Sequence, residues 1–518
     1  MTHGGSRLRV AVLVGLVGLV ALAARLGPVL TGGTLRAAQG YDDGVHLAVA
    51  QRLLAGVLPY RDEVFLHPPG IAVLLSPFAA LAGPLGDSWS LGLARIAFML
   101  LGSVNAMLVA WILARRGILA SAVGGGAYAL WGASLAAEHT VYLEGPIAFG
   151  LLLAVAALHQ AGPGSAARSR AVTRAVAVSG LALGVAATFK IWVAIDVVVL
   201  AALVVSRWGP RTLVRWFGWC ALGAAPILVP FLAQAPGQLW HDVVVVQSAR
   251  PTQGKALPSR FAALDPTATW HAPLTWQVVL ALGLVLVAVL LLPLVRALYR
   301  RVPLALWSDP LWWGVLAAAQ LLALAVAPSF YLHYAAFAAP ALCLVLGAAT
   351  GRLGARARAR RARPAGGAWV QRGPAAIVAL ALVGAVVLAV NPPPMPDAGP
   401  VDNVALAAFA AGHACVWSRN PSYLQVADAS ARQIRAGCPS SPDLLGVWLT
   451  LSGGGRVPGS SATTLDSLVL EQLRGSDAAI LAEQRPMQDL GPRARSYFHE
   501  NFERVRTIDG LELWSRRG

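Results

Sequence analysis

Long apolar runs dominate this sequence. Stretches of roughly 18 or more mostly apolar residues, the length needed to cross a bilayer, recur from Val10 to Val390. The chain is 57% hydrophobic and 13% charged, with a mean hydropathy of +0.62, whereas soluble domains are about 25% charged. So many runs cannot all be buried as core helices. The sequence therefore predicts a mainly α-helical, polytopic membrane protein.

Hydropathy predicts about eleven transmembrane spans. The first follows Arg7 and Arg9, and we expect a retained anchor rather than a cleaved signal peptide, because the span contains Arg25 and lacks a small-residue cleavage site. The predicted spans are residues 10–30, 91–114, 118–137, 144–160, 175–189, 191–206, 214–233, 275–297, 311–328, 331–350 and 374–391.

The net charge of +17 comes mainly from short basic clusters between these spans. The clusters alternate along the chain as cytoplasmic loops do, so they indicate topology rather than nucleic-acid binding. The N-terminus is then expected in the cytoplasm, and the basic run Arg352–Arg372 against anionic membrane lipids. Loops 31–90 and 234–274 and everything after residue 391 are expected outside the cytoplasm.

Composition changes after the proline-rich stretch NPPPMP. Between Asp397 and Glu512 lie 13 of the 24 acidic residues, and short apolar stretches (ACVW, LLGVWLTL, AAILA, LELWSR) are typical of strands, whereas SYLQVADASARQIRAG is typical of a helix. We therefore expect a membrane domain over residues 1–391 and a small extracytoplasmic α/β domain over 392–518. On an oxidising side of the membrane, Cys415 and Cys438 are expected to form a disulfide.

Acidic side chains are scarce in the membrane domain. Five of its eleven lie in loop 31–90, including the adjacent Asp42 and Asp43. One aspartate is enough to cap the amphipathic helix expected from Val45 onward, so the second calls for another role. A carboxylate partly desolvated at the membrane surface suits a general base. Alternatively, the pair and His46 suit a divalent cation, Mg²⁺ or Ca²⁺; we assign no metal ligand.

Farther along the same loop, His67-Pro68-Pro69-Gly70 precedes an apolar helix that contains Pro77 and stops before Pro84. This segment is too short to span comfortably, and we interpret it as an interfacial helix on the membrane surface. The alternative, a broken span, would reverse every later loop and destroy the alternation of charge.

Several later motifs complete a pattern with the acid pair and the His-Pro-Pro element. In chain order they are LARIAF with Arg95, TVYLEGP with Glu144, LALGVAATFK with Lys190, and SFYLHYAAFAAP with Tyr331, His333 and Tyr334. Together they resemble the GT-C membrane glycosyltransferases, in particular the branch of protein O-mannosyltransferases and lipid A aminoarabinose transferases. The resemblance covers most of residues 35–350. The family usually has Glu at the position of Asp43 and Lys-Pro-Pro where this chain has His67-Pro68-Pro69.

The resemblance implies a GT-C fold and an inverting transfer of sugar from a polyprenyl-phosphate donor to a glycan, lipid or protein acceptor outside the cytoplasm. Asp42 or Asp43 would be the catalytic base. The implied substrate-binding residues are Glu144, Lys190, His67, Arg95, Tyr331 and His333.

Simpler roles remain open for some of these side chains. Lys190 can be an interfacial lysine whose amine reaches toward the membrane surface, and Arg95 can be a counter-ion to Glu144 or Asp87. In loop 234–274, the polar side chains are either phosphate or acceptor ligands or simply polar; they are His241, Asp242, Gln247, Arg250 and Lys255.

Two other protein classes are alternatives. A transporter or flippase for lipid-linked sugars would carry polar residues deep in several spans and an internal repeat. Only Asp196 and a few mildly polar positions meet the first condition, and we expect Asp196 to be an internal hydrogen-bonding residue. A cell-envelope scaffold would explain the C-terminal domain but not the acid pair.

Overall fold

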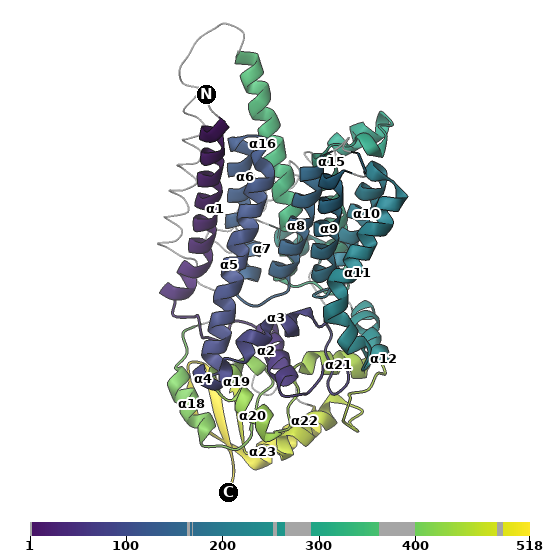
Figure 1. The fold of residues 1–518 in the computed structure, drawn as a ribbon. Coiled ribbons are helices and arrows are strands. Elements are labelled where there is room, and N and C mark those ends of the chain that lie inside the picture. Colours follow the sequence, from purple (N-terminus) through teal and green to yellow (C-terminus); the bar gives the residue numbers. More distant parts are fainter. Residues whose placement is uncertain are drawn as a thin grey trace.

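The computed structural model describes residues 3–162, 166–167, 169–251, 256–264, 292–361, 399–483 and 491–518. It shows a bundle of long helices with a smaller domain at one end, and α2 and α3 lie between the two (Figure 1). The bundle helices are α1 (His3–Thr31), α5 (Asp87–Ala114), α6 (Ile118–Leu130), α7 (Gly132–Glu138), α8 (Glu144–Ala161), α9 (Arg170–Ala187), α10 (Val193–Trp208), α11 (Pro210–Leu232), α15 (Asp309–Val326) and α16 (Ala339–Arg361).

The chain is a multi-pass membrane protein. Within the described ranges, 7 helices are long and apolar enough to span a bilayer, or up to 8 if α6 and α7, bent by 55°, form one span. The predicted span at 191–206 corresponds to α10, which is 16 residues long. The predicted span 374–391 and most of 275–297 lie outside the described residues, so the number eleven stays a prediction.

Small residues allow a close contact between the helices α9 and α11. A Cβ atom on Gly180 would lie 2.6 Å from Cβ of Trp219, and one on Gly223 would lie 2.5 Å from the carbonyl oxygen of Leu181. Side chains at these positions would push the helices apart, so the glycines let the backbones meet, as in other membrane helix pairs.

Buried polar residues join the bundle internally. Arg25 of α1 donates to Glu138 of α7 with Nε 2.9 Å from Oε2, and Asn105 and Tyr128 donate to the other oxygen of the same carboxylate. This ion pair ties α1 to its neighbours. Gln320 donates to Asp196 at 2.8 Å, so the expectation that Asp196 is an internal hydrogen-bonding residue is confirmed.

The described connections α5–α6, α8–α9 and α10–α11, which carry predicted basic clusters, lie at the end of the bundle opposite the C-terminal domain (Figure 1). Arg207 donates to Asp309 at 2.7 Å, His159 approaches the other oxygen of Asp309 at 2.5 Å, and Arg115 donates to the carbonyl of His159 at 3.3 Å. These contacts join the α5–α6, α8–α9 and α10–α11 connections with the start of α15. The alternation of loops expected from charge therefore agrees with the arrangement of the helices.

Shorter elements connect the bundle to the other domain. The segment after Pro69 forms the 10-residue helix α3, which is not among the candidate spans. The broken-span alternative is therefore not what the structure shows. The short elements are α2 (Tyr41–Leu54), α3 (Gly70–Ala79), α4 (Ala82–Leu85), α12 (Pro236–Trp240), the π-helical η1 (His241–Val246), α13 (Leu257–Ala262), and the 3-10 turns η2 (Leu304–Leu306) and η3 (Leu332–Ala338).

The C-terminal domain is a small α/β unit. Its strands are ordered β1-β2-β4-β3, with β1 parallel to β2 and the remaining pairs antiparallel. The Cys415–Cys438 disulfide is present, as expected. The elements are α18 (Asn403–Ala411), β1 (Val416–Trp417), α19 (Pro421–Val426), α20 (Ser430–Ala436), α21 (Leu444–Ser452), α22 (Leu465–Arg474), β2 (Ala478–Ala482), α23 (Pro492–Asn501), β3 (Phe502–Ile508) and β4 (Leu511–Arg516).

Two local predictions in this domain were wrong. LLGVWLTL is helix α21 and not a strand, because Asp443 caps it by accepting from the Gly446 amide at 2.8 Å. The single helix expected over SYLQVADASARQIRAG is divided into α19 and α20. The break falls at Asp428, whose φ of 48° is left-handed and whose carboxylate accepts from the Ser88 amide at 2.8 Å.

Candidate active site

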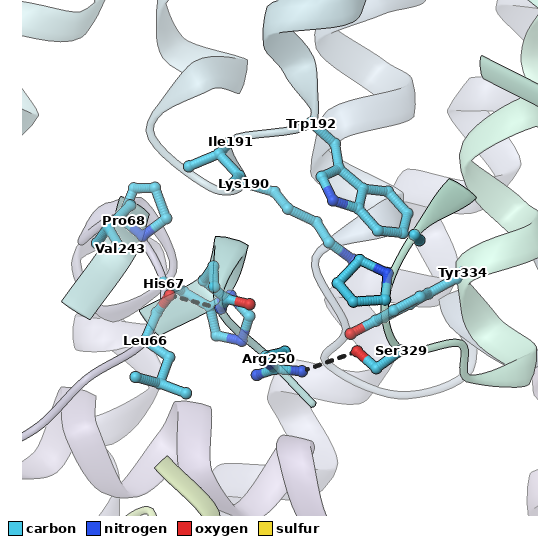
Figure 2. A pocket seen from close by; sticks show the side chains of 13 residues that line it. Leu66, His67, Pro68, Lys190, Ile191, Trp192, Val243, Arg250, Ser329 and Tyr334 are labelled. Atoms are coloured by element: carbon cyan, nitrogen blue, oxygen red, sulfur yellow. Dashed lines mark hydrogen bonds between the residues drawn. The ribbon is translucent and has the colours of Figure 1, made fainter. Parts of the chain in front are cut away.

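A pocket lies where four connections meet near the C-terminal domain. It encloses about 430 Å³, counting its open mouth, and Figure 2 shows Lys190 and Arg250 reaching into it from different elements. The contributing segments are the approach to α3, the α9–α10 connection, η1 with the residues after it, and the α15–η3 connection. The lining residues are Leu66, His67, Pro68, Lys190, Ile191, Trp192, Val243, Gln247, Arg250, Ala327, Pro328, Ser329 and Tyr334.

Lys190 is held rigidly at this pocket. Its side chain is 7% exposed, and its Nζ lies 2.7 Å from Oε1 of Glu144, the first residue of α8. The amine also lies 3.8 Å from the ring centroid of Tyr334 and 4.3 Å from that of Trp192. Because the amine is buried and paired, Lys190 is not an interfacial lysine that reaches toward the membrane surface.

Arg250 adds a second cation. Its Nη1 donates to the hydroxyl of Ser329 at 3.4 Å. Its buried Nε has no hydrogen-bond partner among the described residues, and the same holds for Oε2 of Glu144 and Nε2 of His46. Unpaired polar atoms of this kind are costly unless a ligand or water pairs with them.

His67 lines the pocket with a neutral ring. Burial lowers the pKa of His67 well below its usual value, and the charges of His46, Lys190 and Arg250 act in the same direction. At neutral pH the imidazole can therefore accept one hydrogen bond and donate another. The His46 and His67 rings meet edge to face with centroids 5.7 Å apart.

The two aspartates of the acid pair have different surroundings. Asp43 is 0% exposed. Its Oδ2 forms an ion pair with Arg95 and accepts from Thr140 at 2.8 Å, and its Oδ1 accepts from the Gly44 amide at 2.7 Å and from Ser422 at 2.9 Å. The carboxylate of Asp43 is thus fully engaged by the protein.

Asp42 is the open member of the pair. Its side chain is 37% exposed, and its Oδ2 lies 3.8 Å from Nε2 of His333. The His333 ring stacks on Tyr142 with centroids 4.4 Å apart.

Neither aspartate is the N-cap of α2, since that residue is Gly40 and no side chain caps the helix. The capping explanation for the acid pair is therefore wrong.

The predicted site residues divide into two groups. His67 and Lys190 line the pocket, and Glu144 pairs with Lys190. Asp42 lies 3.8 Å from His333, whose ring centroid is 4.8 Å from that of the lining residue Tyr334. Tyr331 is 39% exposed, with its ring centroid 5.3 Å from that of Tyr334. Arg95 is fully buried and donates to the Leu35 and Ala37 carbonyls besides Asp43. Arg95 is therefore a buried counter-ion, as one alternative expected, but its partner is Asp43 and neither Glu144 nor Asp87.

The acid pair is not arranged as a shared cation site. Among the residues that the structure describes, no group of three or more His, Cys, Asp or Glu side chains is placed to hold a metal ion. Asp43 is occupied by Arg95, and Nδ1 of His46 lies 2.8 Å from the carbonyl oxygen of Val141. We therefore derive no step that uses a metal.

For some residues at the site, the sequence predicted no specific role. Arg250 was one of several polar side chains in a loop, and nothing in its local sequence distinguished it. Tyr334 and Trp192 hold Lys190 through ring contacts. From the C-terminal domain, Asp443 accepts from the Tyr41 hydroxyl at 3.0 Å; burial raises the pKa of Asp443, and the nearby Asp42 carboxylate acts in the same direction.

No protein-family model matches this chain, and no curated protein matches its sequence. Among solved structures, ArnT from Cupriavidus metallidurans bound to undecaprenyl phosphate superposes with a TM-score of 0.53 at 16% identity, over 99% of this chain and 98% of ArnT. The apo state of ArnT gives a TM-score of 0.56 at 16% identity, over 98% and 97% of the two chains.

The Archaeoglobus fulgidus oligosaccharyltransferase in complex with Zn and sulfate gives a TM-score of 0.57 at 13% identity, over 97% of this chain and 73% of its own. These similarities show that the chain has the GT-C fold that its motifs predicted. At such low identity they show the fold alone.

The two aspartates should differ in their contribution to stability. Asp43→Asn leaves the buried Arg95 without its counter-charge, and we expect the free energy of unfolding to fall by about 3–5 kcal/mol. Asp42→Asn, at a partly exposed position, should change it by less than about 0.5 kcal/mol. Thermal unfolding of the two purified variants in the same detergent measures the difference; equal stabilities would contradict the assignment of Asp43 to a structural ion pair.

Proposed function

We propose that this protein is an inverting GT-C glycosyltransferase that moves a sugar from a polyprenyl-phosphate donor to an acceptor. One observation carries the proposal: the partly exposed carboxylate of Asp42 lies 3.8 Å from His333, whose ring contacts Tyr334 in the lining of a pocket that also contains the two cations Lys190 and Arg250. A carboxylate and a cationic pocket are the groups required to activate an acceptor hydroxyl and to hold a phosphate that leaves. The similarity to ArnT bound to undecaprenyl phosphate supports the same donor class.

The cationic pocket suits the donor phosphate. Glu144 pairs with Lys190. Among the described residues Arg250 has no carboxylate within ion-pair distance, so its positive charge is available to an anion in the pocket. Glu144 and the two aromatic rings orient the Lys190 amine, and the unpartnered Nε of Arg250 is a further donor. Fixed donors at the phosphate stabilise the negative charge that grows as the sugar–phosphate bond breaks.

Asp42 is assigned as the general base, and Asp43 as its structural neighbour. Asp42 accepts the proton of the acceptor hydroxyl while that oxygen attacks the anomeric carbon from the face opposite the phosphate. The new glycosidic bond forms as the bond to phosphate breaks, the configuration inverts, and the polyprenyl phosphate leaves with the electron pair. The leaving group is already good, so alignment of acceptor and donor is the main task of the protein.

The alternative of a transporter or flippase has less support. The charged side chains described deep in the bundle have polar partners within it: Arg25 pairs with Glu138, and Asp196 accepts a hydrogen bond from Gln320. A transfer assay separates the two functions, because a flippase moves a lipid-linked sugar without forming a new glycosidic bond.

Transfer activity should depend on Asp42. With a panel of polyprenyl-phosphate sugars and candidate glycan, lipid and protein acceptors, we expect Asp42→Asn to lower turnover about 10²- to 10⁴-fold, the usual contribution of a general base. Arg61→Gln is the control, since this side chain is 45% exposed and pairs with Asp62. Unchanged turnover in Asp42→Asn would remove the proposed mechanism.

Binding of the lipid phosphate should depend on Arg250. Arg250→Gln removes a cation without breaking an ion pair, because the Arg250 guanidinium donates to the Ser329 hydroxyl and has no carboxylate within ion-pair distance among the described residues. We expect about 10-fold weaker binding of undecaprenyl phosphate, the effect of one charge-assisted hydrogen bond. Quenching of tryptophan fluorescence reports binding, since Trp192 lines the pocket. Wild-type affinity in Arg250→Gln would place the phosphate elsewhere.

We propose that the site and the C-terminal domain lie outside the cytoplasm and that the N-terminus lies inside, as the basic loops indicate. Val404 in the C-terminal domain is 77% exposed, and Arg115 is exposed at the opposite end of the bundle. In a Cys220→Ala background, a membrane-impermeant thiol reagent applied to intact cells should label Val404→Cys and leave Arg115→Cys unlabelled. The reverse pattern would invert the topology.

A further inference from the structure

The first turn of α2 contains Asp42, and side chains of the C-terminal domain form hydrogen bonds with this turn. The hydroxyl of Ser422, in α19, lies 2.5 Å from the carbonyl oxygen of Gly40 and 2.9 Å from Oδ1 of Asp43. The amide of Gln425 donates to the carbonyl of Gly44 at 2.8 Å. Ser422, Gln425 and Asp43 are all 0% exposed, so water does not compete for these bonds.

Helix α19 also packs closely against the first turn of α2. A Cβ atom on Gly44 would lie 2.8 Å from Cα of Ser422, so α19 contacts the bare backbone of α2. On another side, the Tyr41 hydroxyl donates to Asp443 at 3.0 Å and accepts from the Leu445 amide at 3.0 Å. Helices α19 and α21 thus hold the residues on either side of Asp42.

Asp42 itself has a titratable neighbour, His333 of η3, at 3.8 Å, and this imidazole is charged only when protonated. The direction of its carboxylate therefore depends on the backbone of the turn from Tyr41 to Gly44. That backbone is fixed by side chains almost 400 residues away in the sequence: Ser422 and Asp43 are 379 positions apart.

We propose that the C-terminal domain is a positioning element of the active site and that Ser422 is its positioning residue. With its single proton between the Gly40 carbonyl and the Asp43 carboxylate, the Ser422 hydroxyl sets the orientation of the first turn of α2 and with it the direction of the Asp42 carboxylate. This inference rests on the proposed function, because it assigns Ser422 a role in the alignment of the base.

A matched control distinguishes a positioning role of Ser422 from a purely structural one. Ser430, in α20, also places a buried hydroxyl against α2, 2.6 Å from Oε1 of Gln51. Ser430→Ala therefore removes the same kind of bond between the same domain and the same helix, far along α2 from Asp42. A second variant, Gly44→Ala, keeps every polar group but forces α19 away from the turn.

The test compares the full-length purified variants in the transfer assay and by hydrogen exchange. In Ser422→Ala and Gly44→Ala we expect kcat to fall about 10- to 100-fold, the effect of a misplacement below about 1 Å, with the donor KM little changed. The backbone amides of the first turn of α2 should exchange faster in both variants. Ser430→Ala should keep the wild-type kcat and the wild-type exchange of that turn.

Two results would overturn the inference while the proposed function stands: a wild-type kcat in Ser422→Ala, or an equal loss of kcat in Ser430→Ala. Failure of the proposed function gives a different result, because the unmodified protein would then transfer no sugar from any donor of the panel.

Discussion

The buried ion pair between Asp43 and Arg95 is the contact on which the site depends. It joins α2 to α5, and the remaining bonds of the Asp43 carboxylate reach Thr140, between α7 and α8, and Ser422, in the C-terminal domain. A buried charge is tolerated only when it is paired and hydrogen-bonded. Each of these elements is therefore constrained to the position that satisfies Asp43, and the adjacent Asp42 is left partly exposed beside His333.

The acidic and the cationic groups of the site lie on different structural elements. Negative charge that can accept a proton lies on α2, whereas the cations for a phosphate lie on the α9–α10 connection and after η1. Glu144 and the aromatic rings hold the Lys190 amine. In the proposed mechanism, this separation lets one site activate a nucleophile and stabilise a departing anion.

Much of the fold follows from local sequence patterns. Apolar length predicts the spans, and the basic clusters predict which helix connections share one end of the bundle, as the contacts of Asp309 confirm. Patterns of strand and helix are less reliable in the C-terminal domain. The LLGVWLTL segment is apolar on all sides, so its periodicity favoured neither structure, and only its capping by Asp443 and its packing made it a helix. Strand β3 was not predicted because the interior of FERVRTI is exposed and mostly polar.

The sequence by itself determined that the chain is a membrane protein with a paired acid before an interfacial helix, and the order of its motifs predicted the GT-C fold. These features are local, since hydropathy, charge clusters and short motifs are each contained in a few dozen residues. Only the tertiary structure decided which aspartate is open, that Arg250 joins Lys190, and that Ser422 contacts the acid pair. Burial and hydrogen bonding between residues hundreds of positions apart set those outcomes, and no local pattern encodes them.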